Sequence, residues 1–178
     1  MKNHMPLKRH QAIVSFSKDH HVGLLLVWKI RQGLNKAVSA ERISNYASLF
    51  FKEDLEKHFR EEEQLLFCKL PVDDIFRKQA EADHQAIYEL VASFEENKND
   101  TGLLKQMADL LENHIRFEER VLFNHLQNNV KADDLEVIAK RFSNNSKAFD
   151  EKWEDVFWEV KNIKEVTHEK NANDLIAN

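Results

Sequence analysis

The segment HFREEEQLLF, which begins at His58, has a near-copy later in the chain, HIRFEERVLF, which begins at His114. The two segments agree at six of ten positions, including the histidine, two adjacent glutamates and the closing Leu-Phe. Residues four apart on a helix lie on one face, so His58 neighbours Glu62 and His114 neighbours Glu118. The repeat therefore predicts a histidine-glutamate pair on each of two helices.

Both pairs fall within apolar stripes of the kind that a core-facing helix presents. The stripe around the first pair contains Phe51, Leu55, Leu65 and Leu66. The stripe around the second pair contains Met107, Leu110, Leu111, Val121 and Leu122. A buried, ionised glutamate is costly unless it is paired or binds a metal. Two such pairs in one interior therefore favour a cation site.

Composition restricts the fold class. Three glycines and two prolines are too few for the tight turns of a strand-rich protein, and charged residues recur within long periodic segments. The chain of 178 residues fits one domain with a core of its own. We expect one all-α domain over residues 1–178, an up-down-up-down four-helix bundle at about 17–128 with C-terminal helices at about 131–168.

Capping and turn residues give the expected helix bounds. Ser17 is the expected N-cap of the first helix, after an irregular lead-in, and Gly33 and Asn35 mark its end. The other expected helices span about 40–70, 73–96, 103–127 and 134–142. The final aromatic segment, FDEKWEDVFWEV, has the spacing of an amphipathic helix. It is expected to pack across one end of the bundle, or, if exposed, to offer a partner surface.

The first and third predicted helices supply further histidines, each directly after an aspartate: Asp19-His20 and Asp83-His84. The face of His20 is expected to carry Leu24, Val27 and Trp28, and the face of His84 to carry Ala80, Ile87, Tyr88 and Val91. Every helix of the bundle then offers one histidine, and alternate helices add a glutamate. The chain is thus two copies of a helix pair.

Four imidazoles and two carboxylates suit two divalent ions of the iron or manganese type, which two-metal sites hold about 3.5–4 Å apart. If both glutamates bridge, each ion has two histidines and two carboxylate oxygens, and an octahedral ion keeps open positions. The predicted metal ligands are His20, His58, Glu62, His84, His114 and Glu118.

Other residues near the proposed ligands are expected to have different roles. His21 points about 100° away from His20 on a helix and is expected at the surface, although an unwound helix start would exchange the two. Glu61, Glu63 and Glu119 are expected to face solvent. Cys68 is expected to be a small buried side chain.

The ordered motifs resemble the hemerythrin-like, or HHE cation-binding, family over about Leu7 to Gln127. KDHHVGLLLVWKIRQG is similar to the first-helix motif of bacterial members, EADHQAI to the third-helix motif, and the two repeated segments to the second and fourth. The resemblance implies a four-helix bundle with a carboxylate-bridged, non-haem di-iron centre; manganese and zinc are the alternative metals. It implies His20 and His58 on one iron, His84 and His114 on the other, and Glu62 and Glu118 as bridges.

The chain departs from the oxygen-carrying members of that family. Those members have a second third-helix histidine at four-residue spacing, where this chain has Ala80 and Tyr88. Glu81 is either a replacement ligand or an ordinary surface glutamate. The fourth-helix bridge of the carriers is an aspartate at five-residue spacing, whereas Glu118 follows His114 by four. These differences argue against simple reversible oxygen transport.

The favoured function is therefore a metal-binding protein, rather than a dedicated enzyme, that binds or senses oxygen, nitric oxide or iron. Dioxygen, another diatomic molecule or a peroxide is the expected ligand. A di-iron enzyme of stress defence, acting in peroxide or nitric oxide turnover or in iron-centre repair, is the first alternative. The second is a metal-free helical interaction module that docks through WEDVFW.

Charge and hydropathy bear on partners and compartment. The net charge of -5, with no basic run beyond Lys8-Arg9, argues against nucleic acid as the main partner. The longest apolar run, near VGLLLVW, is too short to span a membrane, and the start lacks the apolar core of a secretory signal. Cys68 is the only cysteine, so no intramolecular disulfide can form. A cytoplasmic protein is expected, and no protein partner is indicated.

Overall fold

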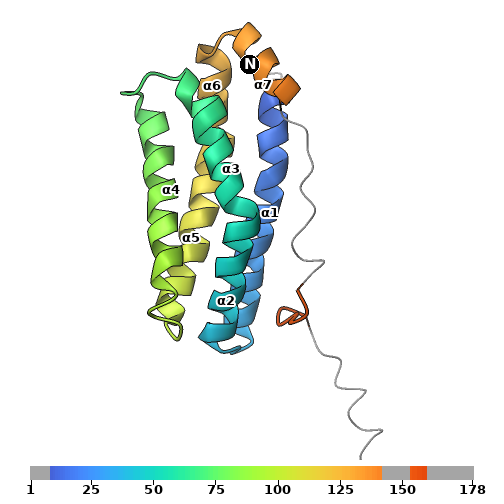
Figure 1. Cartoon of the computed structure of the whole chain (residues 1–178), viewed down its shortest axis with the longest axis vertical. Coiled ribbons are helices and arrows are strands. Elements are labelled where there is room, and N and C mark those ends of the chain that lie inside the picture. Colours follow the sequence, from blue (N-terminus) through green and yellow to red (C-terminus); the bar gives the residue numbers. More distant parts are fainter. Residues whose placement is uncertain (1–8, 142–152, 160–178) are drawn as a thin grey trace, which may run out of the picture.

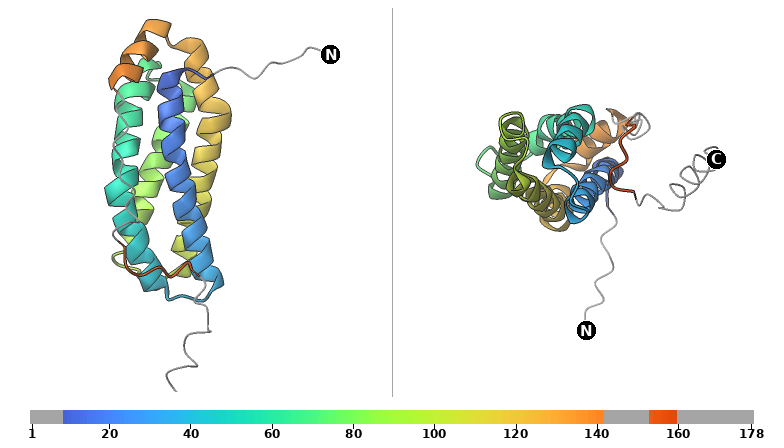
Figure 2. Two further views of the ribbon diagram at one scale, coloured as in Figure 1. Left: turned by 90° about the vertical axis from the view of Figure 1, so that its right-hand side faces the viewer. Right: turned by 90° about the horizontal axis from the view of Figure 1, so that it is seen from below.

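The computed structural model describes residues 9–141 and 153–159, and within these ranges the chain is helical and has no strand. The α-helices are α1 Gln11–Asn35, α2 Ala40–Phe50, α3 Glu56–Glu61, α4 Ile75–Ser93, α5 Thr101–Phe117, α6 Phe123–Asn129 and α7 Ala132–Arg141. Between them lie three π-helical turns, η1 Phe51–Leu55, η2 Glu62–Leu66 and η4 Glu118–Leu122, and a 3-10 turn, η3 Phe67–Lys69. Four long helical rods stand side by side (Figures 1 and 2), which confirms the predicted all-α bundle.

Two of the four rods are α1 and α4, and the other two are composite. The second rod runs from α2 to η3, residues 40–69, and the fourth runs from α5 to α6, residues 101–129. Successive rods alternate in direction, and α1 also packs against α5, so each rod is antiparallel to its neighbours (Figure 2). α7 covers the end of the bundle at which α1 begins and packs against α1.

The π-helical turns at Glu62 and Glu118 move the buried stripe by one residue. A π turn is wider than an α turn, so beyond each glutamate the interior face falls one residue later than an unbroken α-helix would place it. Leu66 and Leu122 are consequently fully buried, whereas Val121 is 37% exposed. The prediction that Val121 faces the interior is wrong for this reason.

α1 begins earlier than predicted. His10 is its N-cap, and the ring Nδ1 accepts a hydrogen bond from the backbone N–H of Ala12. Ala12, Ile13 and Phe16 have no exposed surface, so part of the expected lead-in belongs to the core. Ser17 lies inside the helix and does not cap it. A histidine is an uncommon cap, which is why the sequence pointed to the serine.

The interior face of α1 also differs from the prediction, since Leu24 and Trp28 are 39% and 47% exposed. Gly23 lies on the buried face instead, beside α5. A Cβ atom added to Gly23 would lie 2.8 Å from Cδ1 of Ile115. A larger residue at this position would therefore require Ile115 to move, and the glycine allows α1 and α5 to pack closely here.

The remaining helix bounds lie close to the prediction. α4 is capped by Asp74, and α5 is capped by Asp100, whose side chain accepts hydrogen bonds from the first turn. α4 ends at Ser93, before the predicted limit. α7 confirms the first of the expected C-terminal helices, and the SNNS turn that follows it lies outside the described residues.

The aromatic segment at residues 153–159 packs across α1 and α2, at the end of the bundle opposite α7 (Figure 2). Phe157 and Trp158 are buried against Tyr46, and the ammonium of Lys29 lies 3.8 Å from the Trp158 ring centroid. The expected packing across one end is confirmed for these residues. The expected helix is wrong for these residues, because they form a turn, and Phe157 and Trp158 are buried and so do not offer an exposed docking surface. Residues 149–152 and 160 lie outside the described ranges.

Two apolar clusters fill the interior, one toward each end. The cluster beside α7 contains Ile13, Phe16, Leu66, Phe67, Leu122 and Phe123, among others. The cluster at the other end contains Leu26, Ile30, Tyr46, Phe50, Ile87 and Leu111, among others. His20, His84, Glu62 and Glu118 lie between the residues of these two clusters along their rods, and His58 and His114 lie at the edge of the cluster that contains Leu111. The interior is thus apolar, then polar, then apolar along the bundle.

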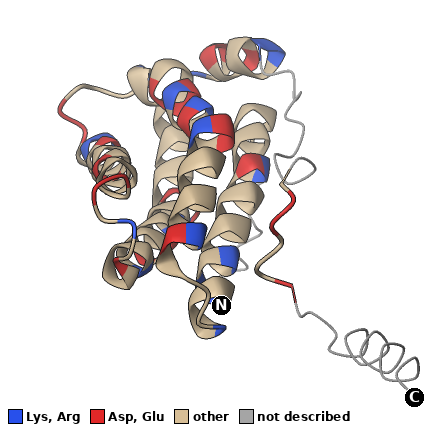
Figure 3. Cartoon of the chain, turned by 60° about the horizontal axis from the view of Figure 1, so that its bottom comes forward, with Lys and Arg blue, Asp and Glu red and all other residues tan. Residues whose placement is uncertain are grey.

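The outer surface is charged and mixed. Lys and Arg alternate with Asp and Glu along the helices seen in Figure 3. Across the described part of the chain, no helix combines the length and the hydropathy needed to cross a membrane. Cys68, expected to be buried, is exposed at the end of the second rod.

The role of Asp74 as the N-cap of α4 can be tested by comparing its substitution with that of the adjacent Asp73. The Asp74 carboxylate accepts hydrogen bonds from the N–H groups of Phe76 and Arg77, and its second oxygen lies 2.7 Å from Nε2 of His125. Asp74→Ala should lower the free energy of unfolding by about 0.5–2 kcal/mol, the usual cost of losing an N-cap. Asp73→Ala is the matched control, because Asp73 is exposed and does not cap the helix. Urea denaturation measures the stability of both variants. Equal losses in Asp74→Ala and Asp73→Ala would contradict the assignment.

Candidate metal centre

Each of the four rods contributes one histidine to the polar layer between the two apolar clusters. His20 comes from α1, His58 from α3, His84 from α4 and His114 from α5, and none is more than 4% exposed. Glu62 and Glu118, the first residues of η2 and η4, have no exposed surface. The structure therefore brings together all six residues that the sequence singled out.

Glu62 lies between three of the imidazoles. Its Oε1 is 3.5 Å from Nε2 of His20 and 3.3 Å from Nε2 of His58. Its Oε2 is 3.4 Å from Nε2 of His84. One oxygen of the carboxylate thus faces the first two rods, and the other faces the third.

Glu118 repeats this arrangement from the fourth rod. Its Oε2 is 2.9 Å from Nε2 of His20, and its Oε1 is 3.4 Å from Nε2 of His114 and 4.0 Å from Nε2 of His84. Each glutamate therefore divides its two oxygens between the His20–His58 pair and the His84–His114 pair.

Two groups of candidate ligands result, and they share both glutamates. The first consists of His20, His58, Glu62 and Glu118; the second consists of His84, His114, Glu62 and Glu118. Within each group, one ligand atom from every residue lies within 4.8 Å of the others. The geometry is that of two adjacent cation sites with common carboxylates.

The hydrogen bonding of the buried atoms fits cations. Within the described residues, both oxygens of Glu62, both oxygens of Glu118, and Nε2 of His20 and of His58 make no hydrogen bond. Imidazole nitrogens lie 2.9–3.5 Å from these oxygens but form no hydrogen bond with them, whereas buried polar atoms are almost always hydrogen-bonded. A cluster of such atoms, all aimed at one small volume, is what bound cations would explain.

His84 and His114 supply a second indication. Their Nε2 atoms lie 3.1 Å apart, deep in the interior. Two nitrogens that bind one ion at about 2.1 Å, roughly at right angles, are separated by about 3 Å. The spacing of this pair therefore suits a shared ion.

A second layer of carboxylates faces the other ring nitrogen of each histidine. Oε1 of Glu119 lies 2.7 Å from Nδ1 of His20, and Oε1 of Glu63 lies 2.8 Å from Nδ1 of His84. Asp19 and Asp83 approach Nδ1 of His58 and of His114 at longer distances, 3.6 and 3.5 Å. Nδ1 of His58 and of His114 make no hydrogen bond within the described residues. Outer carboxylates at the positions of Glu119 and Glu63 fix the tautomer and orientation of a metal-binding imidazole and increase its basicity.

The expected solvent-facing role of Glu63 and Glu119 is therefore wrong. Each follows a central glutamate directly, and each reaches across to a histidine of the other helix pair. The Glu-Glu doublet, present in both copies of the repeat, was the signal in the sequence. It was missed because helical spacing directs Glu63 and Glu119 away from the histidine on their own helix. That spacing does not show that they reach a histidine on a neighbouring rod.

The carboxylates shift the protonation of the histidines in the metal-free centre. Burial acts to lower the pKa of His58 and of His84, but Glu62 and their outer carboxylates raise each pKa to about 9. Burial opposes the charged form of His20 as well, yet Glu118, Glu119 and Glu62 raise its pKa well above the ordinary value. Burial would raise the pKa of Glu119, whereas hydrogen bonds from His20, Ser17 and Arg9 lower it to about 2.

The remaining candidates lie outside both groups. His21 is exposed, as expected, and Ala80 is buried without any ligand atom. Glu81 accepts a hydrogen bond from Nε of Arg77 at 2.7 Å and belongs to neither cluster. Tyr88 is half-buried, with its ring against other aromatic rings. No third-helix side chain therefore replaces the histidine that the oxygen carriers have.

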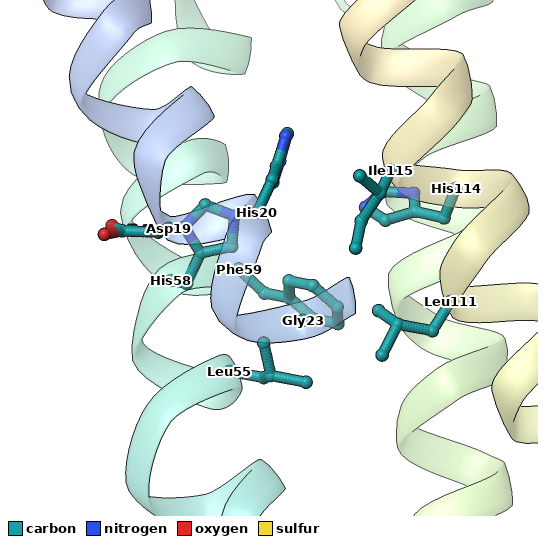
Figure 4. Close-up of a pocket in the computed structure, with 9 residues that line it drawn as sticks. All are labelled: Asp19, His20, Gly23, Leu55, His58, Phe59, Leu111, His114 and Ile115. Carbon is teal, nitrogen blue, oxygen red and sulfur yellow. Dashed lines mark ion pairs between the residues drawn. The ribbon is translucent and has the colours of Figure 1, made fainter. Parts of the chain in front are cut away.

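A narrow apolar crevice lies directly beside the histidines (Figure 4). Its lining includes the rings of His20, His58 and His114, and it is closed by Gly23, Leu55, Phe59, Leu111 and Ile115. The crevice is too tight for a water-sized sphere. The one face of the centre that it reaches is thus lined mainly by hydrocarbon.

A family model, the hemerythrin HHE cation-binding domain, matches residues 12–126. The chain belongs to this family. The match covers most of the four rods and all six central residues, so these side chains lie in a hemerythrin-like domain, and their buried histidine and glutamate clusters are compatible with a metal-binding site. No curated protein and no solved structure matches the chain.

The protonation of the metal-free domain leads to a pH prediction. Because His58 and His84 have a folded-state pKa of about 9 against an ordinary value of 6.5, the folded state binds the additional protons between these values. Their contribution to stability is complete below about pH 6.5 and is lost as the pH rises through about 9. The chelator-treated protein should therefore unfold at lower urea concentration at pH 9.5 than at pH 6.5. Stability that stayed constant or rose over this range would contradict the assignment.

Proposed function

We propose that the chain is a non-haem di-iron protein that binds or senses dioxygen, nitric oxide or iron through a carboxylate-bridged centre. His20 and His58 would hold one iron, and His84 and His114 the other. Glu62 and Glu118 would bridge them. The observation that carries this proposal is the division of each glutamate's two oxygens between the two histidine pairs.

The donor set supports iron as the metal. Each position offers two imidazoles and two carboxylate oxygens, a mixed nitrogen and oxygen environment that suits iron or manganese. Zinc is a further alternative, although it prefers four ligands in a closed tetrahedron. A bound iron would supply redox chemistry and an open position for a small ligand, and the protein's residues would hold it and exclude water.

The crevice supports a small, uncharged ligand. Its walls at Leu55, Leu111 and Ile115 are hydrocarbon, and because it has no room even for a water-sized sphere, any ligand that entered would have to displace these side chains. Apolar surroundings favour molecules such as dioxygen or nitric oxide over ions. A cytoplasmic location stays a prediction from the sequence.

A di-iron enzyme of stress defence is the second candidate. It is favoured by the third helix, where Ala80 and Tyr88 leave the centre a histidine short of the oxygen carriers and thus open to peroxide or nitric oxide. Turnover of either compound by the iron-loaded protein should disappear in His58→Ala combined with His114→Ala. Activity that survived this double substitution would exclude the centre as its source.

Metal content tests the main proposal directly. The protein purified with iron should contain about two irons per chain and absorb in the near ultraviolet after air oxidation. Glu62→Gln removes a shared charge without changing the size of the side chain, and should lower the iron content. Glu61→Gln is the control, because Glu61 is half-buried, pairs with Lys57 and belongs to neither ligand group. Fewer than about one iron per unmutated chain would reject the proposal.

Removal of the metal should also lower stability. Ions that bind only the folded chain add their binding free energy to folding, and here they would neutralise two fully buried carboxylates. Chelation should therefore lower the melting temperature of the iron-loaded protein, and added Fe²⁺ should restore it under anaerobic conditions. An unchanged melting temperature would favour the metal-free interaction module instead.

A further inference from the structure

The two halves of the centre differ in how their outer carboxylates are held. Around Glu119, the hydroxyl of Ser17 donates to Oε1 at 2.6 Å, and Nη1 of Arg9 donates to Oε2. Nη2 of the same guanidinium donates to the backbone carbonyl of Glu119 at 2.6 Å, and Nη1 also reaches Oγ of Ser17 at 3.0 Å. Glu119 is thus fixed from two sides, at its carboxylate and at its backbone, while it bonds to His20.

Glu63, the counterpart of Glu119 in the other half, has no such support. Among the residues that the structure describes, Glu63 has no hydrogen-bond or ion-pair partner except His84, and its side chain is 39% exposed. The repeat shows why. Counted from the Asp-His pairs, the positions of Arg9 and Ser17 correspond in the second copy to Asp73 and Glu81, which are both acidic.

We propose that Arg9 is a positioning residue that makes the two metal positions unequal. Through Glu119 it holds the ring of His20 in the orientation that binds metal, so the His20–His58 position takes up its ion more tightly than the His84–His114 position. This inference rests on the proposed function, since it requires that the centre binds two ions.

The asymmetry that favours His20 lies at Nδ1, because the ring faces differ in the opposite sense. His20 stacks on Phe123 with centroids 5.3 Å apart, and His84 stacks on Phe59 at 3.8 Å, so both ring planes are supported. A carboxylate held at Nδ1 keeps the proton on that nitrogen and leaves Nε2 free for the ion. Glu119 is already ordered before the ion arrives, whereas Glu63 must lose its side-chain freedom to give His84 the same support.

The charge of Arg9 acts in the opposite direction, which makes the experiment decisive. A guanidinium near the centre repels a divalent ion, so a purely electrostatic role predicts tighter binding after its removal. A positioning role predicts weaker binding, by the 10- to 100-fold that loss of an outer partner typically costs. The sign of the change in affinity separates the two.

The test measures Co²⁺ affinity by visible absorption in chains that retain one position each. His114→Ala leaves the His20–His58 position, and His58→Ala leaves the other. Arg9→Ala should weaken Co²⁺ binding about 10- to 100-fold in the first background and leave it unchanged in the second. Arg9→Lys should cause a smaller loss in the first background, because one ammonium cannot make both contacts of the guanidinium fork.

Two further variants complete the test. Arg77→Ala is the matched control, since Arg77 bonds to Glu81 and to the carbonyl of Leu70 but not to an outer carboxylate, and it should change neither affinity. Ser17→Ala tests the same support with a smaller change if Arg9→Ala disturbs folding, as circular dichroism would reveal. It too should weaken only the His20–His58 position.

Several results would overturn the inference. Tighter binding in Arg9→Ala, no change, or equal losses at both positions would each exclude a positioning role. If the unmutated chain bound two Co²⁺ ions and Arg9→Ala gave one of these results, only the proposed difference in affinity between the two positions would be rejected. If the unmutated chain bound no Co²⁺, the proposed function would fall with it.

Discussion

The rest of the structure depends on two carboxylates that have no contact with water. Glu62 and Glu118 are completely buried, and a buried charge destabilises a fold by several kcal/mol unless it is compensated. Four imidazoles, one from each rod, surround them. In the metal-free chain His20, His58 and His84 compensate by holding protons, and in a metal-bound chain the cations would do so. Either way, the bundle must bring all four rods to the same level, which fixes their register.

The two copies of the repeat build the centre from the same parts. Each copy contributes an Asp-His pair on one rod and a His-x-x-x-Glu-Glu segment on the next, and the outer glutamate of each copy reaches the first histidine of the other. The π-helical turns recur at the same place in both copies, directly at the shared glutamate. The copies have diverged where Arg9 and Ser17 support one half alone, and where Gly23 opens a crevice beside that half.

Local patterns in the sequence were sufficient for the helices and for the six central residues. Long periodic segments and the rarity of glycine and proline predicted the bundle, and four-residue spacing predicted each histidine-glutamate pair. What failed depended on neighbouring rods or on departures from ideal helices. The π turn that exposes Val121 and the histidine cap of α1 are departures from ideal helices, and the reach of Glu119 to His20 is a contact between rods. Cys68 is exposed in the 3-10 turn that ends the second rod just before Pro71.

The polar layer also interrupts the hydrophobic core. Apolar contacts alone make each end of the bundle cohesive, one beneath α7 and the other beneath the aromatic segment at residues 153–159. Cooperativity between the two ends must then pass through the imidazoles and carboxylates that separate them. Without cations, amide protons near α7 are free to exchange in openings that the opposite end does not share. Bound cations would thus couple the two apolar clusters, so that they unfold cooperatively.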